Sequence, residues 1–317
     1  MNGILIGTVG LDLAAEEWLE KRRAGIGGSD APAIAGAVSW ASPMSVYLDK
    51  LGLVEREEPN EAMEWGSRHE PTIIKKFEEV SGHLVCGRQE LHAHPEYPWM
   101  LATIDGVFLD DAKTPTLYEG KTSSAWKSQA WKDDVPLYVW IQVQHNLAVT
   151  GCASAVVAAL IGGNHYEQHA IARDETYIAT LIELERAFVE NHLAPQVPPA
   201  IDGSKASEAA LKVLFPEDDG TSIVIDDSAA EALARDLLVY QDEEKQMADH
   251  VRETANALKA LLGEAQRASI GNYRVSWPTV VTKRLDTKAA RAGLGEALEP
   301  YMAESTSRRF TVKEVDG

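Results

Sequence analysis

Two short segments of the sequence place charged side chains inside runs that otherwise have the composition of β-strands. The first predicts a strand over Tyr97–Leu109 that carries Asp105 near its end. Residues Asp110–Pro115 supply the turn before a second strand, which contains Glu119 and Lys121. Because these two residues are two positions apart, their side chains emerge on the same face of the strand.

Two carboxylates and an ammonium group on adjacent strands make a site for a hard divalent cation. Carboxylate oxygens suit Mg2+ or Mn2+, and Lys121 can orient or help deprotonate a metal-bound water. This combination predicts metal-assisted hydrolysis of a phosphodiester. Taken alone, the same residues favour a plainer interpretation, a turn at Asp105 and a solvated pair between Glu119 and Lys121.

Composition indicates an ordinary soluble globular protein. The chain has 317 residues, enough for one large domain or a core with an appendage, with 45% apolar and 25% charged residues. No run is long enough to span a membrane, and the N-terminal residues lack the pattern of a signal peptide. Two cysteines, Cys86 and Cys152, are too few for a zinc site, and we expect free thiols in a reducing cytoplasm.

The net charge of -19, from 30 basic and 49 acidic residues, repels DNA at long range. Basic residues nevertheless cluster at Lys21–Arg23, Lys75–Lys76, Lys283–Arg284 and Arg308–Arg309. A basic channel in an acidic shell and an acidic protein that never contacts DNA are both compatible with this distribution.

Helix and strand patterns alternate up to about Pro199, which predicts an α/β core over residues 1–200. Asp12 is expected to cap the first helix, and Ser29 or Asp30 the helix after a glycine-rich turn. The expected helices cover Asp12–Arg23, Glu61–Ser81, Pro136–Thr150 and Asp174–His192. Two further strands are expected over Ala153–Gly162 and Tyr166–Ala172, paired through a Gly-Gly-Asn turn.

Residues 201–317 are expected to form a C-terminal extension. A mixed connector to about residue 222 precedes a long amphipathic helix or helical hairpin over Ser228–Arg267. Alternation over Ile270–Thr282 predicts a strand, with Arg308–Lys313 as its partner.

Six motifs follow one another in the first part of the chain. They are Trp18-x-x-x-Arg22, Gly25-Ile26-Gly27-Gly28-Ser29-Asp30, Trp65-Gly66-x-x-x-Glu70, Thr103-x-Asp105-Gly106, Glu119-Gly120-Lys121 and Gln142-x-Gln144. Their order over residues 12–195 resembles the lambda-type phage exonucleases, above all the YqaJ-type viral recombinase branch of the PD-(D/E)xK nuclease superfamily. The resemblance implies a restriction-endonuclease-like core, with a mixed central sheet flanked by helices.

The resemblance also implies a role for each matched residue. Asp105 and Glu119 match the metal-binding carboxylates, and Lys121 matches the lysine that serves the nucleophilic water. The carbonyl of Gly120 would complete the coordination, and Glu70 matches an additional acid near a second metal ion.

A pocket for the terminal 5'-phosphate is implied at four further positions. Arg22, Ser29, Thr103 and Gln142 fall where the lambda-type enzymes have an arginine, a serine, a hydroxyl and a glutamine, and Gln142 is also the superfamily's post-lysine glutamine. Spacing from Trp18 favours Arg22 over its neighbour Arg23 as the phosphate ligand. Ile104 departs from the proline that commonly precedes the catalytic aspartate.

The activity implied is Mg2+-dependent 5'-to-3' degradation of one strand of linear duplex DNA to mononucleotides, leaving 3' single-strand tails for recombination. The resemblance also implies two Mg2+ ions per site, which Mn2+ can replace. It further implies a ring-shaped homotrimer and, as a partner, a single-strand annealing protein of the RecT or Beta type. The expected location is the cytoplasm of a bacterial host, with a phage or prophage origin. Two alternatives remain at this point: a RecB-like or restriction-like endonuclease, and a non-enzymatic acidic DNA mimic or regulatory binding module.

Overall fold

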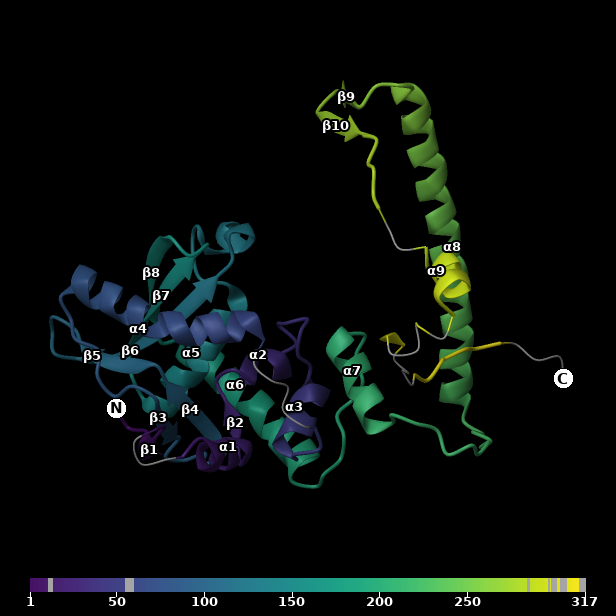
Figure 1. Cartoon of the computed structure of the whole chain (residues 1–317). Helices are drawn as coiled ribbons and strands as arrows, with labels where there is room; N and C mark the ends of the chain where they lie inside the picture. Colours follow the sequence, from purple (N-terminus) through teal and green to yellow (C-terminus); the bar gives the residue numbers. More distant parts are fainter. Residues whose placement is uncertain are drawn as a thin grey trace. The chain divides into compact units, whose positions relative to one another are not determined.

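The computed structural model describes residues 1–10, 14–54, 60–283, 286–295, 297, 301–302 and 307–313. The chain forms two compact units, Met1–Phe215 and Pro216–Gly317 (Figure 1). The boundary expected after residue 200 precedes helix α7 (Lys205–Leu214), which belongs to the first unit. Within the described ranges no helix is both long and apolar enough to cross a membrane.

Two four-stranded sheets lie at the centre of the first unit. One has the order β1 (Ile4–Thr8), β3 (Glu90–Ala93), β4 (Met100–Ile104), β2 (Ile26–Gly27), and the other the order β5 (Gly106–Leu109), β6 (Pro115–Ser123), β7 (Ser154–Ile161), β8 (His165–Ala172). The single strand expected over Tyr97–Leu109 is therefore wrong in one respect, because it is two strands. β4 pairs with β3 and β5 pairs with β6, so the chain changes partners at Asp105.

The second sheet is mixed. β6 runs antiparallel to β5 and parallel to β7, and β7 runs antiparallel to β8. Parallel neighbours need a crossover connection, which here consists of the 3-10 helix η1 (Ala125–Trp131) and helix α5 (Leu137–Thr150). The predicted α/β core with a mixed sheet and flanking helices is confirmed, although the sheet is divided in two.

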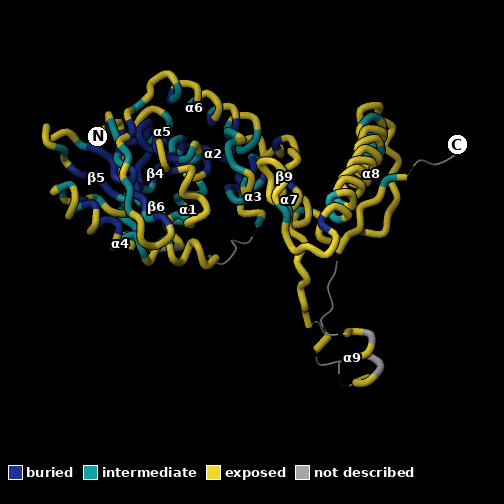
Figure 2. Tube along the Cα trace, turned by 90° about the horizontal axis from the view of Figure 1, so that it is seen from above, coloured by how far each residue is buried: buried dark blue, intermediate teal, exposed yellow. Residues whose placement is uncertain are grey.

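Helices cover both faces of this mixed sheet. Successive side chains of β7 point to opposite faces, so neighbouring residues of this strand pack on different helices. Ala158 belongs to the hydrophobic cluster of Ile74 and Phe77 from helix α4 (Glu61–Ser81). Its neighbour Val157 belongs instead to the cluster of Val143 from α5. Buried residues concentrate in β4, β6 and α5 (Figure 2). The face of β6 that carries Glu119 and Lys121 is thus the one turned toward α5.

Capping interactions fix the ends of α4. The Asn60 side chain accepts a 3.0 Å hydrogen bond from the backbone of Met63, and Gly82 ends the helix with φ of 76°. The predicted helix over Glu61–Ser81 is confirmed. The other helices of this unit are α1 (Ala15–Arg23), α2 (Ala31–Ile34), α3 (Pro43–Lys50), and α6 (Glu175–Phe188) with the π-helical turn η2 (Val189–Leu193). Asp12, the expected cap of α1, lies outside the described residues.

Residues beyond 200 differ from the expected connector. Helix α7 packs on α3, where the Ser207 hydroxyl lies 3.1 Å from the Ser42 hydroxyl and Ala210 is buried. In the second unit, one 35-residue helix, α8 (Ser228–Leu262), replaces the alternative of a helical hairpin.

The strand pairing expected in the second unit is wrong. β9 (Arg267–Ile270) and β10 (Tyr273–Ser276) form a local hairpin, because Gly271 adopts a φ of 56° in the two-residue turn. Arg308–Lys313 does not form a strand in the described part of the chain. A further helix, α9, covers Thr287–Leu294.

Candidate active site

Asp105 is fixed at the junction of the two sheets. Its Oδ2 accepts a 2.9 Å hydrogen bond from the backbone N–H of Gly120 on the adjacent strand β6. Oδ1 accepts no hydrogen bond from any described residue and remains available to a ligand. The break between β4 and β5 therefore brings Asp105 beside the middle of β6.

Glu119 and Lys121 form a closed hydrogen-bonded triangle with Gln142 of α5. The Lys121 ammonium lies 2.5 Å from Glu119 Oε1, and the Gln142 amide donates to the same oxygen over 2.7 Å. Gln142 Oε1 in turn accepts from the Lys121 ammonium over 3.1 Å. Strand and helix thereby hold the carboxylate and the ammonium in one orientation.

Asn146 is a site residue that the sequence did not reveal. It lies one turn after Gln142 on α5, is buried, and donates a 3.3 Å hydrogen bond to Glu119 Oε2. Its own Oδ1 is buried without a hydrogen-bond partner among the described residues. A Cβ on Gly28 would lie 2.3 Å from that oxygen, so glycine is required for the loop to approach α5. The four-residue spacing from Gln142 was the available signal.

Negative charge accumulates around Asp105. Burial, the charge of Glu119 and the charge of Glu70 together hold the pKa of the Asp105 carboxyl well above its ordinary value. Burial alone would lower the pKa of the Lys121 ammonium, but the Glu119 and Asp105 carboxylates raise it. The lysine is therefore held in its charged form beside the two acids.

One cleft of about 690 Å3 lies between α4, β6 and α5, and it is lined by Asp105, Glu119, Lys121 and Gln142. Glu70 of α4 also lines it, and its Oε1 accepts a 2.8 Å hydrogen bond from the Gln89 side chain. Among the described residues, no three His, Cys, Asp or Glu side chains converge closely enough to hold a metal ion between them. Asp105 and Glu119 supply hard oxygen donors and an excess of negative charge, which fits a divalent cation. The hydrogen bond from Gln89 engages Oε1 of Glu70 and leaves Oε2 as a further oxygen donor on the cleft wall.

A second cavity, of about 280 Å3, adjoins the cleft. It collects all four residues expected to hold a 5'-phosphate, Arg22, Ser29, Thr103 and Gln142, and Asn146. The Arg22 guanidinium donates a 2.8 Å hydrogen bond to the Ser29 hydroxyl, and the Trp18 indole N–H donates to Thr103 Oγ1 over 3.1 Å. Gln142 lines both cavities. An arginine, two hydroxyls and an amide are suited to an anion.

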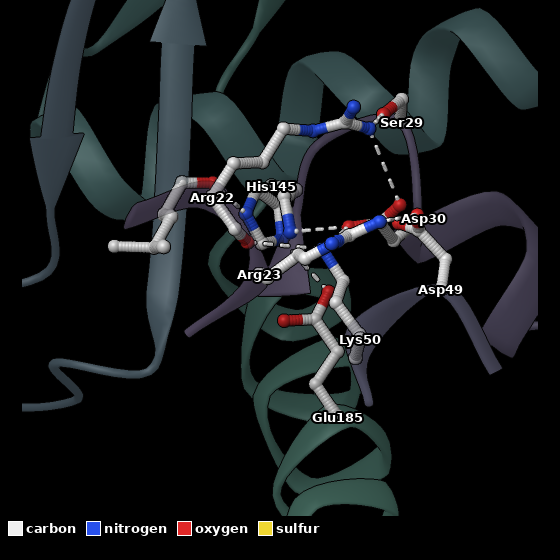
Figure 3. Close-up of polar contacts among 10 residues, drawn as sticks. Arg22, Arg23, Ser29, Asp30, Asp49, Lys50, His145 and Glu185 are labelled. Carbon is white, nitrogen blue, oxygen red and sulfur yellow. Dashed lines mark hydrogen bonds and ion pairs between the residues drawn. The ribbon is translucent and has the colours of Figure 1, made fainter. Parts of the chain in front are cut away.

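The two neighbouring arginines point to different partners (Figure 3). Arg22 lines the small cavity and lies 3.5 Å from Asp30 Oδ1, whereas Arg23 lies 3.9 Å from Asp49. Asp30 does not cap α2 through its side chain, contrary to one of the two expectations for that helix. Its Oδ2 instead accepts from the Gly27 backbone over 2.8 Å.

Lys50, at the end of α3, completes this arrangement (Figure 3). Its side chain is only 1% exposed, and the ammonium lies 2.6 Å from Asp30 Oδ2 and 3.2 Å from the Arg22 carbonyl oxygen. Although burial alone raises it, the charges of Lys50 and Arg22 hold the pKa of the Asp30 carboxyl below its ordinary value. The buried ion pair of Lys50 and Asp30 thus holds Arg22 at both its carbonyl oxygen and its guanidinium.

We expect Lys50→Met to reduce the free energy of unfolding at pH 7 by about 3 kcal/mol, because it leaves the Asp30 charge buried without its main partner. The lowered Asp30 pKa contributes stability above its unfolded pKa of about 3.9 and loses it as pH falls through the folded pKa. The deficit of the variant should therefore shrink at acidic pH, as measured by urea unfolding.

Lys21→Met is the matched control, since Lys21 pairs with Glu17 at 3.6 Å on the surface. We expect it to cost less than about 1 kcal/mol. Equal losses for both variants would contradict the role given to Lys50.

Helix α5 is anchored by His145 (Figure 3). His145 and Glu185 are fully buried, with His145 Nδ1 2.8 Å from the Glu185 carboxylate and Nε2 2.9 Å from the Leu101 carbonyl oxygen. This pair joins α5, α6 and β4, and Leu101 of β4 also lines the small cavity.

A model of the YqaJ-like viral recombinase domain matches residues 17–153. "Uncharacterized protein YqaJ" of Bacillus subtilis (strain 168) is 33% identical over 308 residues, which cover 96% of each chain. The chain belongs to the YqaJ family. The part matched by the YqaJ-like model contains every site residue expected from the sequence.

Two solved structures are also similar to this YqaJ-family chain. The alkaline exonuclease LHK-Exo from Laribacter hongkongensis is 22% identical, with a TM-score of 0.48, and the match covers 56% of this chain and 92% of that one. A phage-related exonuclease from Haemophilus somnus 129PT is 14% identical, with a TM-score of 0.41 and coverage of 52% and 92%.

Proposed function

We propose that this YqaJ-family protein is a Mg2+-dependent 5'-to-3' exonuclease, which resects one strand of linear duplex DNA to mononucleotides. One observation carries the proposal: the cleft of Asp105, Glu119 and Lys121 and the anion cavity of Arg22 adjoin each other and share Gln142. A terminal phosphate in the cavity would bring the first phosphodiester to the cleft. An enzyme that cuts inside a strand needs no such terminal site.

Each residue then has a defined task. Arg22, Ser29 and Thr103 would bind the terminal phosphate, while the Lys121 ammonium, fixed by Glu119, would orient the attacking water. Asp105, Glu119 and the Gly120 carbonyl would hold Mg2+, with Glu70 joining for a second ion. When bound, the metal would supply Lewis-acid stabilisation of the phosphodiester and lower the pKa of water.

Removal of each terminal nucleotide leaves a new 5'-phosphate on the shortened strand. The product would be a 3' single-strand tail, the substrate of a single-strand annealing protein of the RecT or Beta type. A ring-shaped homotrimer around the DNA, with basic residues inside and acidic residues outside, would reconcile DNA binding with the net charge of -19.

We expect the purified protein to degrade linear, 5'-phosphorylated duplex DNA when Mg2+ or Mn2+ is present, and to lose this activity in EDTA, because Asp105 and Glu119 need a cation. Closed circular duplex and linear DNA with 5'-hydroxyl ends should be cut far more slowly. Release of mononucleotides from 5'-labelled and 3'-labelled strands, followed by gel electrophoresis, measures both activity and direction.

Cutting of closed circles would favour the endonuclease alternative. Failure to degrade any DNA with either metal would refute the nuclease hypothesis and favour the alternative of an acidic DNA mimic. Lys121→Ala is the control for a contaminating nuclease, since its preparation should be inactive on every substrate.

A further inference from the structure

An exposed tryptophan lies in the wall of the catalytic cleft. Trp40, on the segment between α2 and α3, is 61% exposed and lines the same cleft as Asp105 and Glu119. Neither the proposed cation site nor the proposed site for the terminal phosphate uses Trp40. Its indole ring presents apolar surface that a ligand bound in the cleft can cover.

The ring of Trp40 is held by side chains from two other elements. Tyr138, at the start of α5, packs edge-on against it, with ring centroids 5.1 Å apart and an interplanar angle of 89°. The ammonium of Lys127, from η1, lies over the Trp40 ring, 5.6 Å from its centre. Both partners also line the cleft. Three separate segments thus converge at the Trp40 ring, which has a cation over it and is still 61% exposed.

The chemistry of this cluster fits one part of a nucleotide strand. An indole face stacks on any nucleobase, and the neighbouring ammonium suits the phosphate that joins one base to the next. Stacking does not depend on the charge of the protein. It therefore supplies affinity for DNA that a chain with a net charge of -19 cannot obtain by long-range attraction.

We propose that Trp40, supported by Tyr138 and Lys127, is the stacking site for a nucleobase of the strand being cut. This inference deepens the proposed exonuclease function and rests on it for the choice of ligand. The site binds bases with little regard to sequence, as an enzyme that removes every nucleotide in turn requires. Trp40 contributes to substrate binding and leaves the chemistry to Asp105, Glu119 and Lys121.

The test pairs protein variants with DNA that lacks single bases. Wild type, Trp40→Ala and Trp40→Phe are compared on 5'-phosphorylated duplexes that are intact or carry one abasic nucleotide at the first, second or third position. Binding is measured by fluorescence anisotropy in Ca2+, and degradation in Mg2+. Trp126→Ala is the matched control, because Trp126 is 90% exposed, is the neighbour of Lys127 and is not among the residues that line the cleft.

On intact DNA we expect Trp40→Ala to raise Kd and KM about tenfold or more, with Trp40→Phe and Trp126→Ala close to wild type. At one abasic position the difference between Trp40→Ala and wild type should vanish, since the stacking partner is already gone. An equal defect on intact and on every abasic DNA, or an equal defect in Trp126→Ala, would overturn the proposal.

Binding is read separately from cleavage, so the two proposals can fail separately. Wild-type protein that binds DNA and cuts none would refute the nuclease while the comparison of intact and abasic DNA still decides the stacking site. Wild-type protein that binds no DNA would overturn both.

Discussion

Replacing Asp105 with asparagine is expected to lower the rate of DNA hydrolysis by about three orders of magnitude while leaving the fold intact. Asparagine keeps the shape and can still accept the hydrogen bond from the Gly120 N–H, which spans 2.9 Å in the native protein. It removes a negative charge needed to bind the cation, and metal assistance is worth several kcal/mol, at 1.36 kcal/mol for each tenfold in rate. Single-turnover degradation of 5'-phosphorylated duplex measures the loss.

The melting temperature provides an independent check of the same substitution. Because burial and the charges of Glu119 and Glu70 disfavour the Asp105 charge, the metal-free variant should melt no lower than wild type. Added Mg2+ should raise the melting temperature of wild type and have little effect on the variant. Undiminished hydrolysis by Asp105→Asn would remove this cleft from consideration as the catalytic centre.

The second large effect is expected at the anion cavity. Arg22→Gln should slow degradation of 5'-phosphorylated ends by about a hundredfold, because hydrogen bonds between charged groups are worth roughly 1.5–3 kcal/mol each. Ends with a 5'-hydroxyl should be degraded at nearly the wild-type rate, so the preference for phosphate disappears. Initial rates on the two kinds of end, measured side by side, give the ratio directly.

Arg23→Gln is the matched control for this substitution. The Arg23 guanidinium faces Asp49 at 3.9 Å and is not among the residues that line the cavity. Its removal should leave the ratio between phosphate and hydroxyl ends unchanged. A loss of phosphate preference in Arg23→Gln but not in Arg22→Gln would reverse the assignment made from the spacing after Trp18.

Features encoded by local patterns could be predicted from the sequence. The bounds of α4 follow from its cap at Asn60 and the left-handed Gly82, and the common face of Glu119 and Lys121 follows from strand periodicity. The mixed sheet around them was implied by the order of motifs. For the helix and the strand face, residues close in sequence determine the result, whereas the mixed sheet followed from the resemblance to a known family.

Features that depend on distant contacts could not be predicted in the same way. Lysine is usually a surface residue, and Lys50 is buried against Asp30 only because α3 approaches the Gly27 loop. Asn146 can donate a hydrogen bond to Glu119 only because α5 faces β6. The partner change at Asp105 is likewise set by which strands lie beside β4 and β5, and the local Gly271 turn overrode the long-range pairing expected for the second unit.

Helix α5 forms one wall of both cavities, and it is buried along most of its length. Gln142 and Asn146 project from it one turn apart, and His145 anchors it to α6 and β4. Any displacement of α5 as a rigid body would carry the two walls together. In the proposed exonuclease, the distance between the bound 5'-phosphate and the phosphodiester to be cut would then be set by this one helix, and the length removed in each step would not depend on how fast the DNA moves.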